Sequence, residues 1–127
     1  MKKQFARIAG FFLLLLSLIG SSMDGQLFEF INVDIKIDII RLVLAVILLY
    51  AGYGNVSIRT SGAILAVVGF FEMVVGIISI VDDELLGLAP STFTAFDMVF
   101  HIVVGLVSFG IGWANILPHS PIERKAS

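Results

Sequence analysis

Four ionisable side chains interrupt the most apolar parts of this sequence, and any chemistry of the chain would start from them. They are Arg41, Glu72, Asp97 and His101. A charge inside a bilayer is costly, so each of these groups needs a partner, a wet cavity or a short reach to the surface. Asp97 and His101 are one helical turn apart, where a carboxylate can fix the tautomer of an imidazole. That pair could carry a proton, or it could be a helix cap beside an interfacial histidine.

Glu72 is the sharpest of these signals, because it lies near the middle of the apolar run 62–81. A lone carboxylate at that depth must be neutral or paired. One interpretation is a proton- or cation-coupled site or a ligand contact, and the other is a glutamate that holds two helices together. The depths of the three residues predict that Arg41, Glu72 and His101 converge in one intramembrane polar cluster in the outer half of a bundle.

The elements that would position these residues are four apolar runs. They cover about 5–22, 37–55, 62–81 and 96–117, and each approaches the ~20 residues that a membrane-spanning helix needs. The 127 residues are 58% hydrophobic and 14% charged, with a mean hydropathy of +1.04. A soluble domain of this size could not bury so much apolar surface. We therefore expect an all-α integral membrane protein with four transmembrane helices, folded as a single domain over 1–127.

The chain also reads as a duplication. Gly10-Phe11-Phe12 returns as Gly69-Phe70-Phe71, and at an offset of sixty Arg41 matches His101. This pattern predicts two tandem two-helix repeats, about 5–55 and about 62–117, followed by a tail at 118–127. Because each repeat has two spans, the halves should insert in the same direction and be parallel. Glu72 matches Leu13, so the carboxylate is not part of the duplicated scaffold.

Every apolar run carries two small residues seven positions apart, which places them on one helix face. The residues are Gly10, Ser17, Ala45, Gly52, Gly69, Gly76, Gly105 and Gly112. Helices in lipid associate where small side chains let their backbones approach. We interpret these residues as helix-packing contacts, with a glycine-lined solute path as the alternative. Thr94 and Asp97 have the spacing of a capping box at the start of the last helix.

Basic residues predict how the bundle is oriented. They precede the first run, lie in the loop after the second and occur in the tail, whereas the other loops are acidic and carry one lysine, Lys36. This positive-inside pattern predicts a multi-pass protein of a bacterial plasma (inner) membrane or an archaeal membrane, with both termini cytoplasmic. The N-terminus also resembles a signal peptide with a weak cleavage site at Gly20-Ser21-Ser22, but the duplication favours a first helix that belongs to the fold.

Other functional classes find little support in the sequence. There is no cysteine, and the net charge of −2 is too small to favour nucleic acid as a partner. We find no nucleophile with a base, no metal-ligand spacing and no phosphate-binding loop. We therefore expect no enzyme, no cofactor and no metal. The expected partners are the lipid bilayer and either a second copy of the chain or another membrane protein.

The plan of a repeated helix pair resembles that of the small four-span membrane proteins of the domain-of-unknown-function 4383 family. The resemblance covers about residues 5–115 and is carried by the step from His101 to Gly105 with Asp97 just before it. In the first half the same step reads Arg41 to Ala45, which departs from the pattern. The resemblance implies a four-helix integral membrane protein with no assigned activity.

Together these observations favour a small membrane protein without a catalytic site, acting as a scaffold, an accessory subunit or a homo-oligomer. The alternative is a small proton-linked transporter or carrier that uses the polar cluster. The two differ in whether water reaches Glu72.

Overall fold

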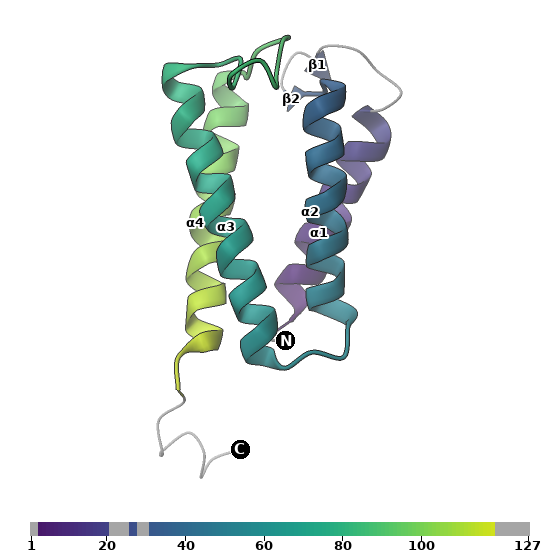
Figure 1. Ribbon diagram of the computed structural model, residues 1–127, viewed down its shortest axis with the longest axis vertical. Coiled ribbons are helices and arrows are strands. Elements are labelled where there is room, and N and C mark those ends of the chain that lie inside the picture. The colour runs from purple at the N-terminus through teal and green to yellow at the C-terminus, as the bar shows by residue number, and fades with distance from the viewer. Residues whose placement is uncertain (1–2, 21–25, 28–30, 119–127) are drawn as a thin grey trace.

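The computed structural model describes residues 3–20, 26–27 and 31–118. Four helices account for most of this part of the chain (Figure 1): α1 is Gln4–Gly20, α2 is Ile35–Tyr53, α3 is Ile58–Val81 and α4 is Ala95–Ile116. The expectation of a helical protein with four helices is confirmed. Of the tail at 118–127, Pro118 is described and residues 119–127 are not.

One short element departs from an all-helical fold. Between α1 and α2, β1 (Gln26–Leu27) pairs in antiparallel fashion with β2 (Ile31–Asn32). The two strands lie above the ends of the helices in Figure 1. The short ladder pairs the backbone of β2 and so helps to hold Asn32 at the outer end of the bundle.

Helix starts follow local capping rules. The Thr94 hydroxyl accepts a hydrogen bond from the Asp97 backbone, and the Asp97 carboxylate accepts one from the Thr94 backbone, which forms a complete capping box. The cap that the sequence predicted for α4 is therefore confirmed. Helix α3 starts in a similar way, because the Ser57 side chain accepts from the Thr60 amide at 3.0 Å. Both caps satisfy amides that have no partner within the helix.

The helices form two closely packed pairs, α1 with α2 and α3 with α4, and α2 and α3 make the main contacts between the pairs. Small residues line the contact within each pair. A methyl group added at Gly52 would lie 2.6 Å from Cγ of Arg7, and one added at Gly105 would lie 2.6 Å from the Met73 nitrogen. Only a residue without a Cβ allows these backbones to approach so closely.

All eight residues of the small-residue stripe are buried, and the six glycines among them face the other helix of their own pair. Gly10 packs on Leu49 across α1 and α2, while Gly69 packs on Phe109 across α3 and α4. The stripe therefore lies within the helix pairs, and the contact between the pairs is made by larger apolar side chains, chiefly Leu13, Leu48, Leu65 and Val68.

The interior holds polar groups beside an apolar core, and the exposed surface of the helices is largely apolar. Ten polar or charged residues among those described are buried, and thirty large hydrophobic residues are exposed. By length and composition, α3 and α4 are the two described helices that are long and apolar enough to cross a membrane. Helix α1 is apolar but shorter, and α2 carries Lys36, Asp38 and Arg41 in its first two turns.

We predict that Gly105→Ala destabilises the protein by about 1–3 kcal/mol, because the added methyl group would overlap the Met73 backbone. The midpoint of thermal unfolding in detergent measures the effect. Gly110→Ala on the same helix is the matched control, since nothing lies within 4 Å of a Cβ added there. Equal midpoints for the two variants would contradict the role of Gly105 as a contact point.

Candidate functional site

Glu72 and His101 meet in the core of the bundle. Glu72 lies on α3 and His101 on α4, and the two side chains are only 5% and 6% exposed. Nδ1 of His101 is hydrogen-bonded to Oε2 of Glu72. The imidazole also stacks on Phe93, with ring centroids 5.1 Å apart and planes 14° from parallel. The carboxylate and the imidazole therefore form one buried titratable unit that bridges two helices.

Arg41 approaches the same place from α2, but it pairs with other groups. Its guanidinium donates to the main-chain carbonyl of Asn32 and, at 3.0 Å, to Oδ1 of Asp38. Arg41, Glu72 and His101 all line one small cavity of about 40 Å³. The structure thus gathers the three residues around one space, and it gives Glu72 the histidine as its direct partner instead of the arginine.

Asp97 forms its hydrogen bonds with groups other than His101, although the two residues are one helical turn apart. Its Oδ2 accepts hydrogen bonds from the backbone amides of Asn32 and Thr94, each at 3.0 Å, and from the Thr94 hydroxyl at 3.1 Å. The carboxylate that orients the imidazole is therefore Glu72 of the neighbouring helix. Asp97 serves as a helix cap and as an anchor for β2.

Asn32 is the residue that sequence reasoning missed. It is fully buried, and its side-chain amide donates to Asp34 Oδ2 at 2.7 Å and to the Thr92 carbonyl at 2.9 Å. Its backbone joins Asp97 and Arg41, so one residue links α2, α4 and the loop before α4. No local pattern marks an asparagine as such a centre, because its partners are up to 65 positions away.

Asp38 is the second missed residue. It lies one turn before Arg41 on α2, and this spacing of opposite charges was the available signal. The carboxylate is 2% exposed. Its backbone carbonyl accepts a hydrogen bond of 2.9 Å from the Ser17 hydroxyl of α1. Its Oδ2 has no hydrogen-bond partner among the described residues, and it lies beside Gly20, the last residue of α1.

The loop 82–94 closes the outer end of this network. Leu85, Ala89 and Phe93 are buried and pack with Ile37 of α2. Leu85, Leu86 and Thr92 have φ angles of 50°, 59° and 66°, in the left-handed region that residues other than glycine seldom adopt. Such conformations persist only where the surroundings hold them. Here the packed side chains of Leu85 and Phe93, and the hydrogen bond to the Thr92 carbonyl, do so.

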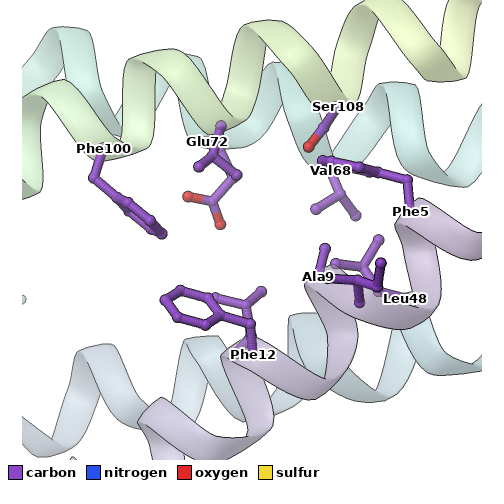
Figure 2. Close-up of a pocket in the computed structure, with 11 residues that line it drawn as sticks. Phe5, Ala9, Phe12, Leu48, Val68, Glu72, Phe100 and Ser108 are labelled. Carbon is purple, nitrogen blue, oxygen red and sulfur yellow. The ribbon is translucent and has the colours of Figure 1, made fainter.

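A larger cavity of about 280 Å³ lies between α1 and the pair formed by α3 and α4. Figure 2 shows the Glu72 carboxylate pointing into this space, with Phe12 and Phe100 beside it. Apart from Glu72 and Ser108, the lining is apolar. It consists of Phe5, Ile8, Ala9, Phe12, Leu13, Leu48, Val68, Phe100 and Val104. Glu72 thus lies between two mainly apolar cavities, and the smaller one is also bordered by Arg41 and His101.

The chemistry available here is proton exchange and ligand binding. Within the described ranges no group of three or more His, Cys, Asp or Glu side chains could hold a metal ion. The Glu72–His101 unit can hold or release a proton, and the apolar cavity can accept a ligand that offers a positive charge or a hydrogen-bond donor to the carboxylate.

Asp34 occupies the N-cap position of α2 without a capping hydrogen bond from its side chain, which instead links β2 to loop 82–94. It accepts hydrogen bonds from the Ser91 amide at 2.9 Å and the Ser91 hydroxyl at 2.7 Å, in addition to the one from Asn32. Partial burial by itself raises the pKa of Asp34. The hydrogen bonds from Asn32 and Ser91, with the nearby charge of Arg41, outweigh burial and leave this pKa below its ordinary value of 3.8.

We predict an acid-labile contribution from Asp34 to the stability of the protein. Because its pKa is lower in the folded state, the contribution is complete above the unfolded pKa of about 3.9 and is lost as the pH falls through the lower folded value. Lowering the pH from about 6 to about 3 should reduce the unfolding temperature of the wild type more than that of Asp34→Asn. Asp83→Asn, at an exposed carboxylate in loop 82–94, is the control. An equal loss in wild type and Asp34→Asn would contradict the prediction.

Comparison with known proteins gives no information about this site. No family model matches the chain, and neither a curated protein nor a solved structure matches it. The resemblance to the domain-of-unknown-function 4383 family therefore stays an expectation, and function has to be argued from the geometry alone.

Proposed function

We propose that this chain is a four-span integral membrane protein that acts as a scaffold, an accessory subunit or a homo-oligomer, without catalysis. The observation that carries the proposal is that four charged residues are buried in the bundle while thirty large hydrophobic residues are exposed on its surface. Lipid is the surrounding in which that arrangement is stable, because it does not solvate charges and does not penalise exposed apolar surface.

The outward surfaces of all four helices support four spans. Of the most apolar windows of α3 and α4, only 39% and 28% is buried, whereas a core helix of a soluble protein is mostly buried. The shorter α1 also exposes Ile8, Leu15 and Leu18 by more than half. Of the three charges of α2 that lower its hydropathy, Asp38 and Arg41 are turned inward and pair with each other, and the exposed Lys36 lies in the first turn of the helix.

Equivalent contacts support two tandem parallel repeats. Gly10 contacts Leu49 in the first pair, and Gly69 contacts Phe109 in the second. The two glycines are 59 positions apart in the sequence, and their two partners are 60 positions apart. The same offsets relate the contact of Gly52 with Arg7 to that of Gly112 with Ala66. Two helix pairs with matching contacts at constant offsets are what a duplicated hairpin would produce.

The ends of the bundle differ in charge, which supports cytoplasmic termini. Lys3 donates to the carbonyls of Gly54 and Val56 at 3.1 and 2.6 Å, and Arg7 donates to the Gly52 carbonyl at 2.9 Å, all at the end that holds the loop between α2 and α3. The opposite end carries the acidic loop 82–94. Three further basic residues of this pattern lie outside the described residues, namely Lys2, Arg124 and Lys125 in the terminal segments.

A scaffold is favoured because the groups of the polar network pair mainly with one another, with Oδ2 of Asp38 as the buried side-chain atom of the described residues that has no hydrogen-bond partner. Arg41 is paired with Asp38, Glu72 with His101, and Asp97 with Asn32. Loop 82–94 covers the outer end of the network, and the large cavity beside Glu72 is apolar instead of forming a polar path. Such a network fixes which helices pair, as buried hydrogen-bonded groups in membrane bundles do.

The membrane arrangement can be tested with single cysteines, because the chain has none of its own. We predict that cysteines replacing Lys36 and Leu86 react with a membrane-impermeant maleimide from the outer side, and that a cysteine replacing Asn55 reacts only from the cytoplasmic side. All three side chains are exposed. Labelling of positions 36 and 55 from the same side would exclude a span formed by α2.

The second candidate function is a proton-linked carrier. It is favoured by one observation, namely that Glu72 is at once bonded to a histidine and open to a cavity. A carrier could bind a proton and a solute in turn at such a carboxylate.

Water access distinguishes the two functions. We predict that, in the scaffold, a cysteine at position 72 is not labelled by the impermeant maleimide from either side, whereas the exposed cysteine at position 86 is. Labelling at position 72 in a folded protein would show that water reaches the middle of the bundle and would make the carrier the better account. A cysteine at position 67, where Val67 is 69% exposed on α3, reports whether lipid alone prevents labelling.

A further inference from the structure

We propose that the apolar cavity beside Glu72 is a binding site for a hydrophobic monocation, an amine or quaternary ammonium that carries an aromatic or branched apolar group. The site goes beyond both proposed functions, because a ligand can be held there whether or not it is transported. Three features of the cavity carry this inference: its size and lining, the charge that faces it, and its position in the bundle.

Size and lining suit a small organic molecule. A cavity of about 280 Å³ is close to the lower end of the range in which proteins hold such ligands, and a mainly apolar wall with one placed polar group is the usual design. The wall includes the rings of Phe5, Phe12 and Phe100. Phe12 and Phe100 approach each other across α1 and α4, with centroids 5.6 Å apart. Aromatic faces attract cations most strongly where water is excluded.

The polar group that faces the cavity is the carboxyl group of Glu72. Glu72 is only 5% exposed, and its carboxylate points into the cavity. One of its oxygens is bonded to His101, and no hydrogen bond to the other is found among the described residues. The guanidinium of Arg41, the nearest fixed positive charge on α2, is engaged by Asp38 and Asn32. It borders the smaller cavity of about 40 Å³ and does not line the larger one.

The wider balance of buried groups points the same way. Three carboxyl groups, those of Asp38, Glu72 and Asp97, are buried against one guanidinium and one imidazole. A cation relieves such a surplus of carboxyl groups, whereas an anion would be repelled by it. A neutral apolar occupant would fill the space but leave the carboxylate facing hydrocarbon, which is costly.

The position of the cavity gives the ligand a route of entry. Two of the lining residues on α1, Ile8 and Phe12, are themselves 60% and 43% exposed on the outer surface of the bundle. In the membrane that surface faces the hydrocarbon, so a ligand dissolved in the bilayer reaches the cavity from the side, between α1 and α4. A hydrophobic cation concentrates in that phase, whereas a hydrophilic one does not.

The test is equilibrium binding of radiolabelled benzyltrimethylammonium to the full chain in lipid nanodiscs. We expect saturable binding to the wild type. Glu72→Gln, which keeps the shape of the side chain and removes its charge, should weaken binding by about tenfold or more. Ala9→Phe, which fills the cavity without touching the carboxylate, should abolish it. Glu84→Gln is the matched control, because it removes an exposed carboxylate from loop 82–94, and it should bind as the wild type does.

A neutral competitor of the same shape separates charge from fit. Neopentylbenzene replaces the quaternary nitrogen by carbon, and it should displace the labelled cation poorly. Absence of saturable binding to the wild type would overturn the proposal. So would unchanged binding to a folded Glu72→Gln variant, or equal displacement by neopentylbenzene, which would indicate a neutral occupant such as a lipid acyl chain. If Ala9→Phe does not fold, as judged by its unfolding temperature, Glu72→Gln and the neutral competitor still decide the outcome.

Discussion

Polar groups in this bundle have to find their partners inside the protein, because the outer surface of the helices is apolar. This constraint explains why Arg41, Asp38, Asp97 and Asn32 form a connected set instead of separate surface pairs. A buried charge without a partner costs far more than the pair gains, so each member depends on the others. The network in turn fixes the position along the bundle at which α2, α4 and the loops beside them meet. Loop 82–94 can then hold its left-handed residues, since the packing of Leu85 and Phe93 and the bond from Asn32 hold it on both sides.

The two helix pairs are held together by different means. Within each pair, glycines allow close backbone contact, and dispersion forces over that contact contribute to stability. Between the pairs, the contact is made by larger side chains at the centre and by the polar network at the outer end. On the α1 side of this junction lies the cavity into which Glu72 points (Figure 2).

Glu72 joins the structural and the functional interpretations. As a partner of His101 it belongs to the packing of α3 on α4, and as a wall of the cavity it is available to a ligand. Its counterpart in the first half of the sequence is Leu13, which is buried in the apolar core. The two halves therefore differ at the position that matters most for chemistry.

The sequence by itself determined what depends on near neighbours and on composition. The four helices, the capping box of Thr94 and Asp97, and the burial of the small-residue stripe follow from hydropathy and from spacings of three to seven residues. The gathering of Arg41, Glu72 and His101 around one cavity also follows from their depths along the helices. Only the tertiary structure decided the pairing within that group. Glu72 takes His101 because α3 packs on α4, Arg41 takes Asp38 on its own helix, and Asp97 takes the backbone of Asn32. Such choices depend on helix rotation and on loops that bring distant residues together, and no local pattern in the chain encodes them.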